Sequence, residues 1–166
     1  MWRFVCDKCG ISSAELNTPE ELHKVCHEHV CPTDMWKDII AFHLKFALLK
    51  RSNPGFVGNE LSWFRIQFMQ EELDEFIDAY QSGDLAAAAD ALVDLVYVVL
   101  GTAYLMGIPF NLCWNEVHKA NMLKVRAKRE SESKRGSTYD VIKPEGWVAP
   151  DLNKILDEEK SKCVNL

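Results

Sequence analysis

Five carboxylates in two neighbouring segments of the chain are the residues best suited to do chemistry. Glu71, Glu72 and Glu75 lie in a segment whose apolar residues recur at helical spacing. At about 100° per residue, one broad apolar arc, which we expect to face the core, is formed by Leu61, Phe64, Phe68, Leu73 and Phe76. Glu72 and Glu75 fall inside this arc and Glu71 lies at its margin. Because burying an unpaired carboxylate is energetically costly, acidic residues on such a face require a physical reason, and metal binding or catalysis supplies one.

The next apolar segment repeats the anomaly. Asp90 and Asp94 are one helical turn apart in the otherwise apolar run 85–108, and we expect both to be buried. If the two segments form antiparallel helices, all five carboxylates converge, and like charges at that density repel unless protons or cations neutralise them. Hard oxygen ligands favour Mg²⁺ or Mn²⁺. The sequence therefore predicts a metal site built by two helices.

Polar and basic residues further along the chain are candidates to bind the phosphate groups of a ligand at such a site, and we call them the phosphate side. His118, Asn121, Lys124 and Lys128 recur at i, i+3, i+7 and i+10, which predicts one stripe of donors on a helix. Taken alone, such a stripe is also typical of a solvated helix face. Arg65 shares the apolar arc with the acids, so it either contacts phosphate or forms a buried ion pair with Glu72.

Helical spacing runs through most of the chain after residue 33, and no strand pattern or internal repeat is evident. Turn residues at 52–55, 82–84 and 107–109 separate four helices, the last of which is predicted to reach about residue 128. A short further helix is predicted near 151–160. The predicted fold is all-α, a four-helix bundle with antiparallel neighbours.

Three regions follow from this pattern: a Cys/His-rich module at 1–33, a helical core at 34–130 and an extension at 131–166 that packs on the core. The chain has 166 residues, of which 48% are hydrophobic, so it has room for one main domain.

The N-terminus of the chain lacks the features of a secretory signal, and we expect a cytoplasmic protein. The run 85–108 has the length of a membrane span, but a central Asp opposes insertion, so we expect a core helix and no membrane partner.

The distribution of charge separates acids from bases. With 19 Lys and Arg against 25 Asp and Glu, the formal net charge is −6, which argues against a dedicated nucleic-acid-binding protein. However, seven of the 19 basic residues lie between Lys119 and Arg135. This basic stretch is the best support for the alternative to an enzyme, a zinc-containing nucleic-acid-binding or regulatory helical module without catalysis.

The N-terminal module contains four of the six Cys and three of the five His. Cys6 and Cys9 form a C-x-x-C pair, and Cys26 lies 17 residues after Cys9. Tetrahedral Zn²⁺ needs four such ligands, and either Cys31 or His29 provides the fourth. Because the cytosol keeps thiols reduced, metal binding is favoured over disulfides, and a thiol-rich arm without metal is the alternative.

The sequence resembles a known family, the all-α nucleoside triphosphate pyrophosphohydrolases of the MazG and phosphoribosyl-ATP pyrophosphohydrolase-like group. The resemblance covers roughly residues 34–156 and leaves out the Cys-rich module. It rests on four motifs, which are EELDE at 71–75, DALVDLVY at 90–97, EVHKANMLK at 116–124 and KPEGW at 143–147.

The family pattern is E-x-x-E on one helix and E-x-x-D on the next, and together they bind Mg²⁺. Glu72 and Glu75 match the first pair and Asp94 matches the last acid, but Ala91 stands where the family has a Glu. The resemblance implies that Asp90, one turn from Asp94, substitutes for it and that the number of bound ions is open.

The resemblance further implies the reaction and the assembly. Asn121 and Lys124 match the phosphate-contacting positions, with His118 and Arg65 as further candidates. A water molecule, with Glu71 or Glu72 as the base, would attack the α-phosphorus of a (deoxy)nucleoside triphosphate and yield a monophosphate and pyrophosphate. A homodimer or homotetramer is implied.

Two questions about the substrate stay open at this point. Phosphoribosyl-ATP is a weaker alternative, because Val98 stands where that branch carries a His after its Tyr. Base and sugar preference cannot be read from the sequence: Phe42, His43, Phe46 and Trp63 could stack on a base, yet aromatic residues at helical spacing are more often core.

Overall fold

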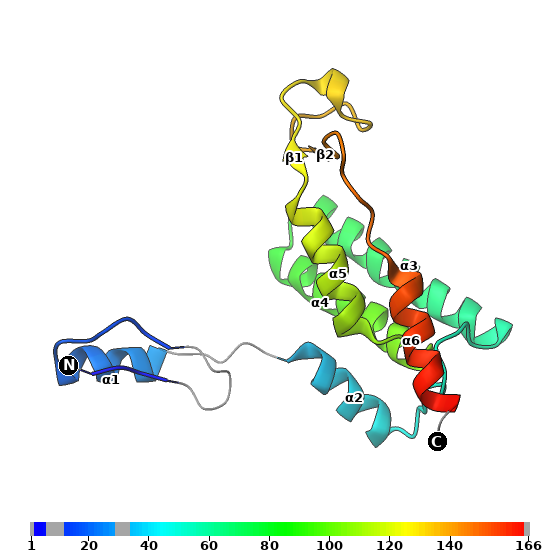
Figure 1. The fold of residues 1–166 in the computed structure, drawn as a ribbon, viewed down its shortest axis with the longest axis horizontal. Helices are drawn as coiled ribbons and strands as arrows, with labels where there is room; N and C mark the ends of the chain where they lie inside the picture. Colours follow the sequence, from blue (N-terminus) through cyan, green and yellow to red (C-terminus); the bar gives the residue numbers. More distant parts are fainter. Residues whose placement is uncertain (1, 6–11, 29–33, 165–166) are drawn as a thin grey trace. The chain divides into compact units, whose positions relative to one another are not determined.

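The computed structural model describes residues 2–5, 12–28 and 34–164 of the chain. Contacts divide the chain into two compact units, Met1–Met35 and Trp36–Leu166. Most of the chain is helical, and the two strands of the helical unit are short. The predicted all-α class is confirmed (Figure 1).

In the N-terminal unit, two antiparallel bridges join residues on either side of the C-x-x-C segment. Trp2 pairs with Leu16, and Val5 pairs with Ser12. The zinc candidates Cys6 and Cys9, like His29 and Cys31, lie outside the described residues. Cys26, the one described candidate, is exposed on α1 (Pro19–Glu28).

A capping box begins α1. The backbone N–H of Glu21 donates to Thr18 Oγ1 at 3.1 Å, and Glu21 Oε2 accepts from the N–H groups of Asn17 and Thr18 at 2.8 and 3.4 Å. This reciprocal pattern satisfies backbone donors that would otherwise lack partners at the helix start. The helix carrying Cys26 is therefore specified by local sequence.

The described residues of the second unit form five α-helices: α2 (Met35–Lys45, which starts one residue before the unit), α3 (Asn59–Ser82), α4 (Leu85–Leu105), α5 (Phe110–Met122) and α6 (Leu152–Val164). The closest association is between α3 and α4, which pack against each other as an antiparallel pair. Gly83 ends α3 in the left-handed conformation, with φ of 73°, and Asp84 caps α4 by accepting from the N–H groups of Ala86 and Ala87. The predicted turn at 82–84 is confirmed.

A small core closes the other end of this helix pair. It consists of Ile39 on α2 with Leu100, Tyr104 and Leu105 on α4, and the rings of Trp36 and Phe110 pack against it. Trp36 stacks on Phe110 with ring centroids 5.5 Å apart. These contacts hold α2 and the start of α5 against the C-terminal half of α4.

A β-ribbon follows α5, in a region where the sequence predicted continued helix. α5 ends at Met122, and β1 (Val125–Arg126) pairs antiparallel with β2 (Val141–Ile142), with a short 3₁₀ helix, η1 (Glu130–Glu132), between them. The prediction of a helix to residue 128 and of no strands was therefore wrong. β-branched residues occupy three of the four strand positions, and their partners lie about 16 residues away, beyond the range of helical periodicity.

Much apolar surface of α3 and α4 is uncovered. Within the described part of the chain, one helix, α4, is long and apolar enough to cross a membrane, with a mean hydropathy of 1.8, and 22% of that window is buried. Four of the exposed apolar residues on each helix recur at i, i+7, i+11 and i+14: Ile66, Leu73, Ile77 and Tyr80 on α3, and Leu85, Leu92, Val96 and Val99 on α4. We call these two sets the apolar stripes of α3 and α4.

Candidate active site

Glu72 is the buried carboxylate of the helix pair. Its side chain is 6% exposed, and its Oε2 atom has no hydrogen-bond partner among the described residues. Burial raises the pKa of Glu72 above its ordinary value, and the negative charges of Glu75, Asp94, Glu71 and Asp90 raise it further. A buried carboxylate with like charges around it and no donor among the described residues is stabilised by protonation or by a nearby cation.

The other four carboxylates of the cluster are exposed around Glu72. The prediction that Glu75, Asp90 and Asp94 are buried was wrong. The two Asp are exposed because a different face of α4 packs against its neighbours. That face carries the small buried residues Ala88, Ala91 and Val98, and Asp90 and Asp94 lie at its edge. Ala91, at the position where the family pattern has an acid, is 2% exposed.

The buried positions of α3 also differ from the predicted apolar arc. Arg65, Glu72 and Ala79 are buried, and they follow one another at i, i+7 and i+14. Leu61, Phe64 and Leu73, which helical spacing placed in the core, are 38–56% exposed. The prediction of burial is confirmed for Arg65 and Glu72. It was wrong for these apolar residues, because only a narrow strip of the α3 surface, at i, i+7 and i+14, is covered by neighbouring residues.

Arg65 is held between the two helices by neutral acceptors. Its Nε donates to Thr102 Oγ1 at 3.0 Å and its Nη2 donates to the Val98 carbonyl at 2.7 Å, while the guanidinium lies 5.3 Å from the Phe68 ring centroid. The ion pair with Glu72 that the sequence left open is not formed by these two described residues. Burial lowers the pKa of Arg65. Two of its donors are thereby committed to α4.

His43 packs against the same region of α4. Its Nδ1 lies 2.8 Å from the Ile39 carbonyl and its ring is 4.7 Å from the Tyr104 centroid. Burial lowers the pKa of His43; the hydrogen bond with Ile39 opposes this shift, and the Arg65 charge adds to it. A Cβ on Gly101 would lie 2.8 Å from His43 Cε1 and 3.1 Å from Arg65 Nη2. Gly101 is thus the residue that makes room for both side chains, a role that helical spacing did not reveal.

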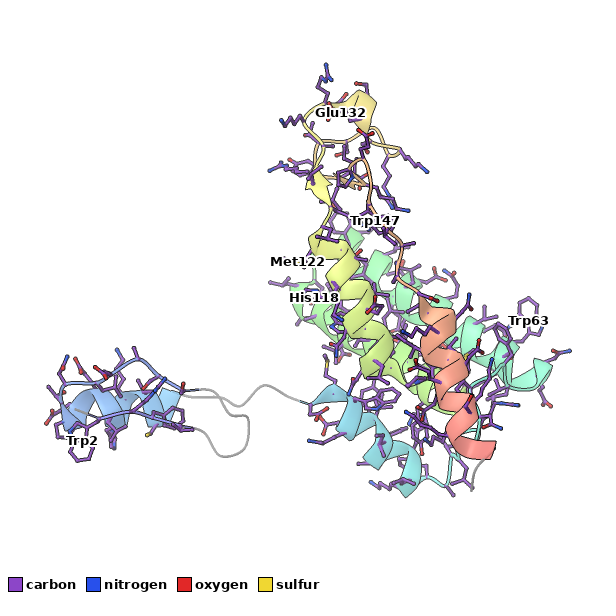
Figure 2. All side chains as sticks on the ribbon, in the orientation of Figure 1. Trp2, Trp63, His118, Met122, Glu132 and Trp147 are labelled. Carbon is purple, nitrogen blue, oxygen red and sulfur yellow. The ribbon has the colours of Figure 1, made fainter. Side chains whose placement is uncertain are left out.

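Of the other aromatic residues that could stack on a base, Phe42 and Phe46 contact each other with centroids 4.8 Å apart, and Phe42 also contacts Tyr97 at 5.2 Å. Trp63 is 65% exposed and projects from α3 (Figure 2). His43 is buried in the core contact described above, whereas Phe42 and Phe46 keep exposed ring surface.

The basic residues of the phosphate side do not share one helix face. His118 and Asn121 are exposed on α5, but Lys124 and Lys128 lie beyond its last residue, Met122. The predicted continuous stripe was therefore wrong. Lys124 instead lies where α5 meets the β-ribbon, with its Nζ 5.8 Å from the centroid of the Trp147 ring, and Figure 2 shows Trp147 beside this end of α5.

Antiparallel packing places the α3–α4 turn and the C-terminal end of α5 at one end of the helical unit. α3 ends, α4 begins and α5 ends at the same end in Figure 1. Here an open hollow of about 420 Å³ lies at the α3–α4 turn, and it is lined by Glu75, Asp78, Ala79, Ser82, Asp84, Ala87 and Asp90. Its volume is in the range of small-ligand sites.

The acidic cluster fits a divalent cation by its chemistry but is not assembled as a metal site. Among the described residues, no three His, Cys, Asp or Glu side chains stand close enough together to hold one ion. The unpartnered Glu72 oxygen and the exposed carboxylates beside it are hard oxygen donors of the kind that Mg²⁺ and Mn²⁺ prefer. A bound ion would therefore have to draw Glu75 and Asp94 toward Glu72.

Comparison with known proteins identifies the helical unit. Residues 39–121, which are 83 of the 166 residues, match the family described as phosphoribosyl-ATP pyrophosphohydrolase. No curated protein matches the chain. The matched region extends from α2 to α5 and contains the acidic cluster, His118 and Asn121, whereas Lys124 and the β-ribbon follow it.

Proposed function

The chain belongs to the phosphoribosyl-ATP pyrophosphohydrolase family, a MazG-like all-helical family whose members' activity is pyrophosphohydrolysis of nucleotides, and from this premise we propose that it converts (deoxy)nucleoside triphosphates and water to monophosphates and pyrophosphate. The observation that carries the proposal is the buried side chain of Glu72, whose Oε2 has no hydrogen-bond partner among the described residues and whose charge four neighbouring acids oppose. In a family of nucleotide hydrolases, this is the position for a cation that neutralises phosphate.

In the proposed reaction, the oxygen of a water molecule forms a bond to the α-phosphorus and the bond from that phosphorus to the α–β bridging oxygen breaks. Pyrophosphate leaves with the electron pair. Glu71, which is exposed beside Glu72, accepts a proton from the attacking water. When bound, a Mg²⁺ or Mn²⁺ ion supplies positive charge to the phosphate oxygens. Glu72, Glu75 and Asp94 would hold it, with Asp90 in place of the acid that Ala91 lacks.

The phosphate side of the proposal consists of exposed donors from α5 and its C-terminal end. Asn121 and Lys124 contact phosphate oxygens, and His118 lies one turn before Asn121 on α5. We assign Arg65 a positioning role, because its Nε and Nη2 already donate to Thr102 and Val98. It fixes the separation of α3 and α4 and thus of the acids that they carry.

The proposal is tested by incubating the full-length protein with Mg²⁺ or Mn²⁺ and each ribo- and deoxyribonucleoside triphosphate, with phosphoribosyl-ATP as a separate arm, and separating the products by anion exchange. Monophosphate with pyrophosphate from some triphosphates, absent for Glu72→Gln, is the expected result. Hydrolysis of phosphoribosyl-ATP alone would replace the proposed substrate. No product from any nucleotide, together with salt-sensitive binding to an oligonucleotide, would favour a binding module.

For the N-terminal unit, we propose a structural Zn²⁺ held by Cys6, Cys9, Cys26 and either Cys31 or His29. The support from the described residues is that two bridges pair the segments flanking the C-x-x-C motif and that the Cys26 thiol is exposed. Metal analysis of the purified protein should find one zinc per chain, and Cys26→Ser should lower this content whereas Cys113→Ser should not. A protein without zinc would remove the proposal.

We also propose that the protein is a homodimer or homotetramer. The apolar stripes of α3 and α4 support this, because soluble monomers rarely leave contiguous apolar surface of that extent uncovered. A second copy of the chain presents the same stripes and could cover them in a symmetric contact.

A further inference from the structure

Lys124 and Lys143 flank the β-ribbon at matching positions. Val125 pairs with Ile142 and Arg126 with Val141, so the next opposed positions in this register are 124 and 143. Side chains at opposed positions of an antiparallel ribbon lie on the same face, and like charges placed there repel. The register therefore places the two lysines at neighbouring positions where the ribbon meets α5 and the KPEGW segment.

One aromatic ring joins the two lysines. Lys143 Nζ lies 4.3 Å and Lys124 Nζ 5.8 Å from the centroid of the Trp147 ring. The indole quadrupole attracts cations, which partly offsets the repulsion between them. The ring is itself anchored to α5, because its Nε1–H donates to the Ala120 carbonyl at 2.7 Å.

A tight turn places the ring there. The backbone N–H of Trp147 donates to the Pro144 carbonyl at 3.1 Å, and Gly146 has a φ of 74°, in the left-handed region that glycine adopts without strain. The turn follows Lys143 directly. The segment KPEGW is thus a unit in which Lys143 and Trp147 are brought together by Pro144 and Gly146.

No ion pair with a described carboxylate is formed by either lysine of this pair. Among the described residues, neither Lys124 nor Lys143 forms an ion pair, whereas other basic residues of the same region do: Lys119 with Glu116, Arg129 with Glu132 and Arg135 with Asp140. Two cations that make no ion pair with the described residues, on a ring anchored to the helix that carries Asn121, are suited to bind an anion with several negative charges.

We propose that Lys143 is a second phosphate-binding cation, which together with Lys124 clamps the pyrophosphate portion of the substrate. The inference rests on the proposed function and extends it. Although the KPEGW segment resembles the family, residue 143 lies outside the matched residues 39–121, and the resemblance implies no role for Lys143. The ligand class is a di- or triphosphate chain. The ribbon follows the C-terminal end of α5, which in Figure 1 lies at the same end of the helical unit as the α3–α4 turn.

The test is calorimetric titration of the full-length protein with inorganic pyrophosphate in the presence of Mg²⁺. Lys143→Ala should weaken binding about tenfold, since a hydrogen bond to a charged group is lost, whereas Lys143→Arg should keep most of the affinity. The matched control is Lys134→Ala, because Lys134 is an exposed lysine in the loop of the same ribbon and makes no ion pair with any described residue.

The outcomes separate the clamp from the reaction. Equal affinities of wild type and Lys143→Ala, an equal loss in Lys134→Ala, or no pyrophosphate binding by wild type would overturn the clamp, even if the protein hydrolyses nucleotides. Pyrophosphate binding that depends on Lys143 in a protein that hydrolyses no nucleotide would keep the anion site and remove the proposed function. If an oligonucleotide binds more tightly than pyrophosphate and its binding depends on Lys143, the two lysines would be assigned to nucleic-acid binding and the clamp would be overturned.

Discussion

Arg65 and Glu72 lie seven residues apart on the buried line of α3, yet their charged groups form no ion pair with each other. The Arg65 guanidinium donates to Val98 and Thr102 of α4 at 2.7 and 3.0 Å, and Glu72 Oε2 has no partner among the described residues. A salt bridge would have neutralised the buried carboxylate. Its absence leaves Glu72 as the acid whose charge a bound cation could compensate.

Glu72→Gln should reduce nucleotide hydrolysis by more than about 100-fold, since even the loss of an outer partner to a metal ligand costs 10- to 100-fold. Folding should be preserved, because the change removes a buried negative charge that four neighbouring acids oppose. Steady-state kinetics and a thermal melt measure the two effects. Asp74→Asn, an exposed acid hydrogen-bonded to Gln70, is the control and should change activity less than twofold. Full activity in Glu72→Gln would contradict the assignment.

Gly101→Ala should destabilise the protein by about 1–3 kcal/mol, the usual cost of overpacking. The new methyl group would lie 2.8 Å from His43 Cε1 and 3.1 Å from Arg65 Nη2, so both side chains would have to move. Urea unfolding measures the loss. Gly58→Ala is the control, because a Cβ there meets nothing within 4 Å and φ is −55°. Similar midpoints for the two variants would show that the packing around Gly101 is loose.

Stability should depend on pH through His43. Burial and the Arg65 charge lower its pKa in the folded state, so the neutral form is favoured there and the unfolded chain binds more protons near pH 6. The stabilising contribution is present above the unfolded pKa of 6.5 and is lost as the pH falls below it, with a slope of at most about 1.4 kcal/mol per pH unit. The difference in unfolding free energy between wild type and His43→Gln should therefore shrink from pH 7.5 to about 5.5. A constant difference would mean that His43 titrates normally.

Charges on the apolar stripe of α4 should disrupt the proposed oligomer. Leu92 and Val96 are 46% and 44% exposed in the single chain, and Glu at both positions would place carboxylates in a covered contact. Light scattering coupled to gel filtration should show a dimer or tetramer for wild type and a monomer for the double variant. Leu112→Glu on α5, where Leu112 is 50% exposed, is the control and should keep the wild-type mass. A monomeric wild type would contradict the proposal.

The sequence by itself determined the elements whose signals are local. Helical periodicity, the Gly83 and Asp84 caps and the Thr18–Glu21 capping box each act within a few residues, so the all-α class, the α3–α4 turn and the burial of Arg65 and Glu72 could be predicted. Only the tertiary structure decided which face each helix turns inward. Burial depends on which surfaces meet, and the narrow line of small residues on α4 left Asp90, Asp94 and Glu75 exposed. The β-ribbon and the two lysines over Trp147 depend on pairing across about 16 residues, which no local period encodes.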